Sequence, residues 1–226
     1  MDFQSPIHDY YEDLAPRYDE DRFGNSYGRY IHQQELAIMN RLIPIEPTGP
    51  TLDLGCGTGR LLQWATHGLD YSPAMIEEAK KKYPQHILQA GSAWETPYED
   101  HIFHTAYSFH LLMHLQPQEI EAVFQEAARI IGPGGRFIFD IPSKKRRGLV
   151  GYKADSWHAA QSLSLKEIKW MDTSIWKLQR YSGVLFLPVH RLPNSLRAPV
   201  RWVDNLLCRS PWREYASYMV VELIRL

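Results

Sequence analysis

The sequence predicts an α/β fold built on a parallel, doubly wound sheet. Short strand-like apolar runs alternate with helical runs through the middle of the chain, and this alternation is typical of parallel βαβ units. The 226 residues are 44% hydrophobic and 12% aromatic, which suits one globular domain with a sizeable core. No Gly/Ser-rich or Pro-rich linker divides the chain.

The expected elements begin at residue 50. A strand over 50–54 leads to a short helix over 58–65 and a second strand over 66–70. Ser72 is a favourable N-cap for the next helix, with Pro73 at its first position, and strands follow over 86–90 and 103–109. The helix from Pro117 keeps helical apolar spacing and ends in a Gly-rich stretch, before a fifth strand over 136–141.

The last third of the chain predicts a different arrangement. The segment from Ser164 to Glu167 reads as a capping box that opens a short helix. Strand patterns within 175–188 and 215–226 enclose a partly helical, arginine-bearing insert. We expect this part to add an antiparallel strand pair to the parallel sheet.

Composition excludes several classes of protein. A formal net charge of -1 argues against a general nucleic-acid binder. The two cysteines are far apart and form neither a disulfide framework nor a metal cluster, which fits a reducing, cytoplasmic compartment. The acidic N-terminal stretch does not resemble a signal peptide, and no apolar run is long enough to predict a membrane span.

The glycine turn after the first strand is the most informative motif. It reads G-x-G-x-G over residues 55–59, whereas a dinucleotide site needs G-x-G-x-x-G and a P-loop needs Gly-Lys-Ser/Thr. Asp53 would repel a phosphate but suits a cationic amine, and Asp70 ends the next strand, where it can accept from two ribose hydroxyls. An amine, a ribose and no phosphate describe S-adenosylmethionine.

Five motifs in order resemble the class I S-adenosylmethionine-dependent methyltransferases. They are "LDLGCGTGR", "GLDYSPAMIEEA", "GSAWETPYED", "YSFHLLMHL" and "IIGPGGRFIFDIP". "YYEDLAPRYDEDRFGNSYGRYI" is similar to the helical lead-in of bacterial small-molecule members. The resemblance implies a Rossmann-like, seven-stranded, three-layer α/β/α domain over 1–226. It implies a lead-in or lid over 1–45, a cofactor-binding core over 50–142, and C-terminal strands that cover the acceptor pocket over 143–226.

The resemblance also implies roles for individual residues. Asp53 would face the methionine amine, Asp70 would hold the ribose, and Tyr18, with Tyr11, would fold over the cofactor unless both rings merely pack on the core. Ser92 stands where the family often has an acidic residue, and the crossover from Gly59 to Asp70 is short. The remaining implied cofactor contacts are the turn (Gly55, Cys56, Gly57, Thr58, Gly59), the adenine pocket (Tyr71, Met75, Ala93, Trp94) and the methyl-donor side (Ser108, Phe109).

His110 and His114 follow the fourth strand, at the expected acceptor side. Either could act as a general base for a hydroxyl or thiol acceptor, or could be a packing or surface residue. A carboxylate acceptor would need no base. The H-E-x-x-H pattern of zinc sites is missing, so we expect no metal. Cys56 reads as a small packing residue.

We therefore expect a methyltransferase that uses S-adenosylmethionine and acts on an oxygen or nitrogen of a small-molecule or short-peptide acceptor. The alternatives are a non-catalytic S-adenosylmethionine-binding protein and an NAD-dependent oxidoreductase. Neither a nucleic-acid partner nor membrane insertion is expected, and the oligomeric state stays open. The arginines at 191, 197, 201, 209 and 213 form a solvated face, attract an anionic acceptor, or rest on a membrane surface.

Overall fold

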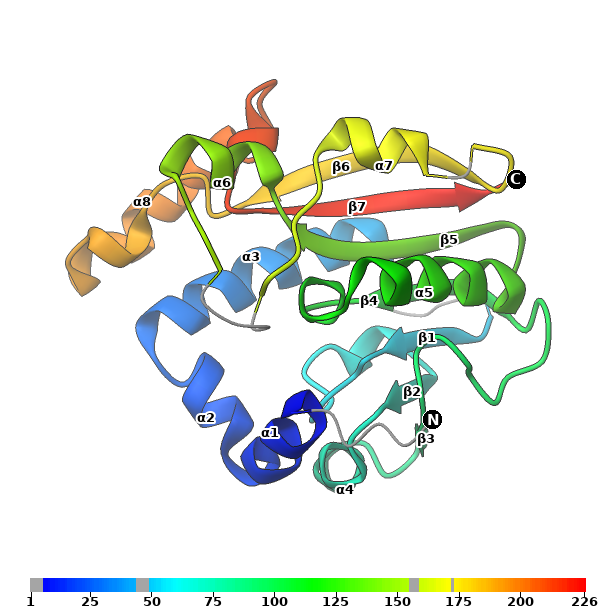
Figure 1. Cartoon of the computed structure of the whole chain (residues 1–226). Coiled ribbons are helices and arrows are strands. Elements are labelled where there is room, and N and C mark those ends of the chain that lie inside the picture. The colour runs from blue at the N-terminus through cyan, green and yellow to red at the C-terminus, as the bar shows by residue number, and fades with distance from the viewer. Residues whose placement is uncertain (1–5, 44–48, 155–158, 172) are drawn as a thin grey trace.

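A computed structural model of the chain describes residues 6–43, 49–154, 159–171 and 173–226. Within them lies a seven-stranded sheet of order β3-β2-β1-β4-β5-β7-β6 (Figure 1). The pairs from β3 to β5 are parallel, and β7 runs antiparallel to both β5 and β6. This confirms the predicted parallel sheet with a C-terminal antiparallel pair. The strands are β1 (Thr51–Leu54), β2 (His67–Asp70), β3 (Ile87–Ala90), β4 (Phe103–Ser108), β5 (Ile131–Pro142), β6 (Trp176–Val184) and β7 (Tyr218–Arg225).

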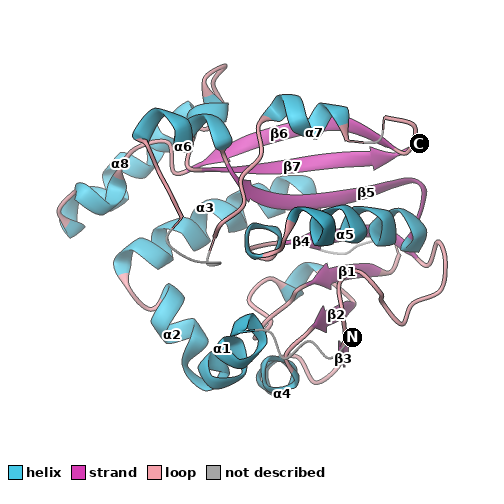
Figure 2. Ribbon diagram, in the orientation of Figure 1, coloured by secondary structure: helices cyan, strands magenta, loops and turns pink. Residues whose placement is uncertain are grey.

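Helices cover both faces of the sheet, so the domain has three layers (Figure 2). Successive strand residues point to opposite faces: Phe137 and Phe139 pack with α5 and α7, whereas Ile138 packs with α3 and α4. The helices are α1 (Pro6–Leu14), α2 (Tyr18–Phe23), α3 (Ser26–Leu42), α4 (Pro73–Lys82), α5 (Pro117–Ile130), α6 (Lys144–Val150), α7 (Leu165–Trp170) and α8 (Asn194–Leu207).

Local signals set two of the helix starts as expected. The Ser72 hydroxyl accepts from the Met75 N–H at 3.1 Å with Pro73 in the first turn of α4. Ser164 and Glu167 form the reciprocal capping box at the start of α7. Both caps satisfy backbone N–H groups that have no partner within the helix.

Two expected elements differ from the structure. Instead of a helix over 58–65, only a 3₁₀ turn forms over Leu62–Trp64, because the glycines before it hold left-handed backbone and leave too few residues for an α-helix. The Gly-rich stretch belongs to β5, which begins at Ile131. Gly135 lies so near the backbone of His104 that a Cβ would come within 2.8 Å, and the bulged β4–β5 pairing therefore runs through the glycines.

Helix α8 packs on α3, outside the sheet layers, through a buried carboxylate. Asp204 is fully buried and accepts from Tyr30 Oη at 3.0 Å, Gln34 Nε2 at 2.9 Å and the Leu187 N–H at 2.7 Å. Three donors are therefore satisfied by one side chain. Among the helices of the described residues, none combines the length and the apolar character that crossing a bilayer requires.

Replacing Asp204 by alanine should destabilise the fold by about 2–4 kcal/mol, because it leaves buried donors without an acceptor. The measurement is the free energy of unfolding in a denaturant titration. Glu121→Ala, at an exposed position of α5, is the control and should stay within about 0.5 kcal/mol of the parent. Equal stability of the two variants would contradict the anchoring role of Asp204.

Candidate functional site

The glycine turn after β1 borders a cavity at the carboxyl ends of the central strands. Gly55, Gly57 and Gly59 have φ angles of 80°, 52° and 85°, a conformation that glycine adopts without steric cost. A Cβ on Gly57 would meet no atom within 4 Å. Because Gly57 also lines the cavity, the open space beside it is available to a ligand.

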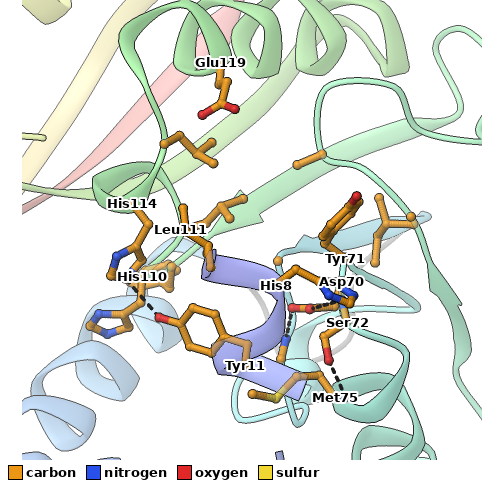
Figure 3. Close-up of a pocket in the computed structure, with 18 of the residues that line it drawn as sticks. His8, Tyr11, Asp70, Tyr71, Ser72, Met75, His110, Leu111, His114 and Glu119 are labelled. Carbon is orange, nitrogen blue, oxygen red and sulfur yellow. Dashed lines mark hydrogen bonds between the residues drawn. The ribbon is translucent and has the colours of Figure 1, made fainter. Parts of the chain in front are cut away.

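Asp70 lies at the end of β2 and faces the same cavity (Figure 3). Its Oδ2 accepts from the Gly57 N–H at 2.7 Å and its Oδ1 from the Ser72 N–H at 3.0 Å. Each carboxylate oxygen has a second lone pair, so the pair of oxygens can still accept from two neighbouring hydroxyls. Burial raises the pKa of Asp70, although both backbone donors oppose this shift.

Aromatic rings form the wall beside Asp70. The rings of Tyr71 and Trp94 lie 6.4 Å apart and 30° from parallel, and His8 from α1 contacts Tyr71 edge-on at 5.2 Å. Met75 is buried under the same wall. A flat, mostly apolar ring system fits such a surface.

The N-terminal lead-in closes the cavity from the other side. Tyr11 and Tyr18 both line it. The hydroxyl of Thr58 donates to Asp19 at 2.5 Å, and the Ala74 N–H donates to Glu12 at 3.1 Å. These bonds tie α1 and α2 to the glycine turn and to the start of α4.

Most of the expected site residues gather around this cavity. Eleven of them line it, namely Tyr18, Gly55, Gly57, Asp70, Tyr71, Met75, Ala93, Trp94, Phe109, His110 and His114. Six do not belong to its lining: Asp53, Cys56, Thr58, Gly59, Ser92 and Ser108. Thr58 turns to Asp19, and Cys56 and Ser108 are buried in the fold. The predicted cofactor contacts of all these residues stay predictions.

His110 lies in a buried charge network at the end of β4. Its Nε2 is 2.7 Å from Glu35 Oε1, and its Nδ1 is 3.7 Å from Asp140 Oδ2. The other oxygen of Glu35 accepts from Arg60 at 2.6 Å. Burial lowers the pKa of His110, but Glu35 and Asp140 outweigh it and raise that pKa overall. The two neighbouring acids therefore favour the protonated form of the ring.

The same network strains the backbone and sets the charge of Glu35. His110 has a φ of 60°, uncommon for a residue with a side chain, and its N–H donates to Asp140 Oδ1 at 2.7 Å. Burial raises the pKa of Glu35, but Arg60 and His110 together lower it to about 2. Glu35 is consequently ionised, and α3 is fastened to the ends of β4 and β5.

Glu35, His110 and Asp140 are also the one group among the described residues with the donor set of a metal site. Their ligand atoms lie within 4.8 Å of one another. However, Arg60 and His110 already supply positive charge to both Glu35 oxygens, which a divalent ion would have to displace. The expectation that the site needs no metal stays a prediction.

His114 lies next to Tyr11, on the far side of the cavity from Tyr71 (Figure 3). The Ala159 N–H donates to its Nδ1 at 3.1 Å, and its Nε2 is 3.2 Å from Tyr11 Oη. A ring nitrogen that accepts carries no proton. The Nε2 of neutral His114 therefore carries the hydrogen and donates it to Tyr11, so in this arrangement the ring offers a donor and not a base.

Asp53 lies behind the glycine turn, in the middle of the buried strand β1. It is 3% exposed, and burial raises its pKa to about 8 against the opposing effect of Arg60. Near neutral pH the side chain is mostly uncharged. A cation brought close to it would favour its ionised form.

Glu35, Asp140 and Arg60 belong to the site but do not follow from the motifs. The sequence does contain one sign that these acids are buried, because Glu35 and Asp140 lie inside the apolar segments "QELAIM" and "RFIFDIP". Buried charges of this kind need partners. The sequence does not show which partners they have.

Other residues also line the cavity. Tyr11 and His8 belong to the expected lid, and the side chains of Ser72, Leu111 and Glu119 complete the lining.

Comparisons with known proteins agree with this geometry. Residues 52–139 match a family model described as "Methyltransferase domain". The chain is 32% identical over 114 residues to (+)-O-methylkolavelool synthase of Herpetosiphon aurantiacus, covering 45% of this chain and 40% of that protein. The chain spans about half the length of the curated relatives it matches.

Two solved structures share the fold over nearly their whole length. One is a S-adenosylmethionine-dependent methyltransferase of Thermotoga maritima, titled a possible histamine N-methyltransferase, with a TM-score of 0.69, 19% identity, and 96% and 99% of the two chains covered. The other is magnesium protoporphyrin IX methyltransferase of Synechocystis with bound S-adenosylhomocysteine, with a TM-score of 0.66, 16% identity, and 97% and 98% covered.

The pKa of Asp53 predicts a pH-dependent stability. In the folded chain it is about 8, above the value of about 3.9 in an unfolded chain. Between these values the folded state keeps a proton that the unfolded state loses, so stability falls as pH rises. Asp53→Asn removes this loss. We expect the free energy of unfolding of the variant, relative to that of the parent, to be about 2–4 kcal/mol higher at pH 8.5 than at pH 4.5. The measurement is denaturant unfolding without ligand.

The matched control is Asp13→Asn, at an exposed carboxylate of α1, which should show no such difference. The same gain from Asp53→Asn at both pH values would contradict the raised pKa.

Proposed function

We propose that the chain is a class I S-adenosylmethionine-dependent methyltransferase, which binds S-adenosylmethionine in this cavity and transfers the methyl group to an oxygen or nitrogen of a small-molecule or short-peptide acceptor. The match of residues 52–139 to a methyltransferase-domain model and the shared fold support this proposal. The observation that carries the proposal is the Asp70 carboxylate, which two backbone N–H groups hold in the cavity beside the open space at Gly57. The Asp70 carboxylate can accept hydrogen bonds from ribose hydroxyls, and the open space at Gly57 lets the adjoining part of the cofactor approach the backbone.

The other cofactor contacts follow from the shape of the cavity. Tyr71, Trp94 and Met75, with Ala93, form the side that suits adenine. Gly55 and Gly57 lie where the methionine part would approach the turn, with the acidic Asp53 behind it. When bound, the cofactor supplies an electrophilic methyl group on a sulfonium. The chain's own residues bind it, orient the acceptor and exclude water.

The two histidines favour an acceptor that needs no base. Nε2 of His110 donates to Glu35 while its Nδ1 lies toward Asp140, and Nδ1 of His114 already accepts from the Ala159 N–H. In the present arrangement neither ring is ready to take a proton. We therefore propose that His110 is a positioning residue, that His114 holds the Tyr11 hydroxyl in place at the acceptor side, and that the nucleophile is a carboxylate oxygen or an unprotonated amine.

The relatives support both kinds of atom, since one is named for an O-methylated product and one structure is titled a possible N-methyltransferase. We further propose that 1–226 is one domain. The lead-in within 1–45 acts as the lid, residues 50–142 bind the cofactor, and 143–226 cover the acceptor. Both cysteines are free thiols, which supports a cytoplasmic location.

Asp70→Asn should weaken binding of S-adenosylhomocysteine by about 10–100-fold, because a hydrogen bond to a charged acceptor contributes about 1.5–3 kcal/mol. Titration calorimetry of the parent and the variant gives the two affinities, with Asp13→Asn as the control. A parent that binds NAD but not S-adenosylhomocysteine would refute the proposed cofactor. Unchanged affinity in Asp70→Asn would remove Asp70 from the site.

A screen with methyl-labelled S-adenosylmethionine tests the acceptor class. Among carboxylic acids, amines and phenols, we expect label in the first two groups. On such an acceptor, His114→Ala should lower kcat less than tenfold, whereas loss of a general base costs about 10²–10⁴-fold. The control is His104→Ala, at an exposed position.

Labelling of phenols alone, with a kcat at least a hundredfold lower in His114→Ala, would instead assign His114 as a general base. That result would overturn the proposed acceptor class. Binding of S-adenosylhomocysteine without any methylated product would favour a non-catalytic binding protein.

A further inference from the structure

Helix α8 buries a carboxylate against the protein and exposes several apolar side chains. Its side toward the protein carries the fully buried Asp204, which is bound by Tyr30 and Gln34 of α3. Four of its apolar residues are instead exposed to solvent. Leu196 is 48% exposed, Trp202 70% and Leu206 50%. A helix of a globular domain normally turns such a stripe toward the core, so packing within the described fold does not explain this one.

The exposed apolar residues form a continuous row. Leu196, Trp202, Val203 and Leu206 recur at helical spacing, and Trp212 follows the helix with 62% of its surface exposed. The turn around Glu214 then contacts α6, whose Lys145 pairs with Glu214 at 2.6 Å. Leu149 and Val150 of α6 are 68% and 59% exposed. Both helices lie at the end of the sheet where β5 terminates (Figure 1).

The segment that contains this row has an excess of positive charge. The segment from Val189 to Arg213 contains five arginines (191, 197, 201, 209 and 213), and its one acidic residue is the buried Asp204. Arg191 and Arg209 are exposed. Along this segment, the exposed apolar residues are thus accompanied by two exposed cations, and the one carboxylate is buried.

We infer that α8, with Trp212 and the end of α6, is a docking surface for an anionic lipid membrane. A helix with exposed tryptophan and leucine on one side and arginines beside them lies in the interface of a bilayer, with its apolar side among the acyl chains and its cations at the headgroups. A second copy of the chain fits less well, since a symmetric contact would place the same arginines opposite one another. The inference goes beyond methyl transfer and does not depend on it.

Vesicle sedimentation with the full chain tests the surface. We expect the protein to pellet with vesicles of phosphatidylglycerol and phosphatidylcholine, to do so less as salt rises, and to bind pure phosphatidylcholine at least tenfold more weakly. The double variant Trp202→Glu with Leu206→Glu should lose at least tenfold in affinity for the anionic vesicles. Arg209→Glu should also lower the affinity for anionic vesicles, by a smaller factor than the double variant.

The matched control is Ile87→Glu, at an apolar position of the edge strand β3 that is 51% exposed, and it should bind vesicles like the parent. Equal melting temperatures of all variants check the fold. Absence of binding to anionic vesicles, or equal binding by the double variant, would overturn the inference. A concentration-dependent dimer that the double variant abolishes, without vesicle binding, would assign the surface to a second copy instead.

Discussion

The carboxylate of Glu35 is buried between Arg60 and His110, and the rest of the site depends on this arrangement. Removing a charged group from water costs several kcal/mol, which only close opposite charges and good hydrogen bonds offset. Here one oxygen accepts from the Arg60 guanidinium at 2.6 Å and the other from His110 Nε2 at 2.7 Å. Glu35 belongs to α3, Arg60 to the segment after the glycine turn, and His110 to the end of β4. These two contacts of Glu35 thus link three elements around the cavity.

The cofactor end of the site is largely predictable because its determinants are local. Left-handed glycines at 55, 57 and 59, the acid at the end of β2 and the Ser72–Pro73 helix start lie within about twenty residues, and each follows from a backbone rule. The short helix expected at 58–65 is the failure in this region. Apolar spacing favoured it, but the positive φ of Gly59 and the short distance to β2 allowed only the 3₁₀ turn.

The acceptor end is less predictable because distant segments meet there. Tyr11 and His114 are 103 residues apart in sequence, and Glu35 and His110 are 75 apart. The motifs placed His110 and His114 beside the cavity but said nothing of their partners. Those partners decide the chemistry, since the Ala159 N–H selects the tautomer of His114, and Glu35 and Asp140 raise the pKa of His110. A histidine's role as a base therefore cannot be derived from its position after a strand.

The two ends also differ in how their charges are compensated. Around His110, both cations and carboxylates are present and face one another at short distances. Around the glycine turn, burial raises the pKa of both Asp53 and Asp70, and neither acid has an ion-pair partner among the salt bridges of the described residues. A cation bound there would favour the ionised form of both acids and release the proton of Asp53. The folded chain therefore has uncompensated acids around the glycine turn, where we propose that the sulfonium and the amine bind, and a compensated network around His110, where we propose that the acceptor binds.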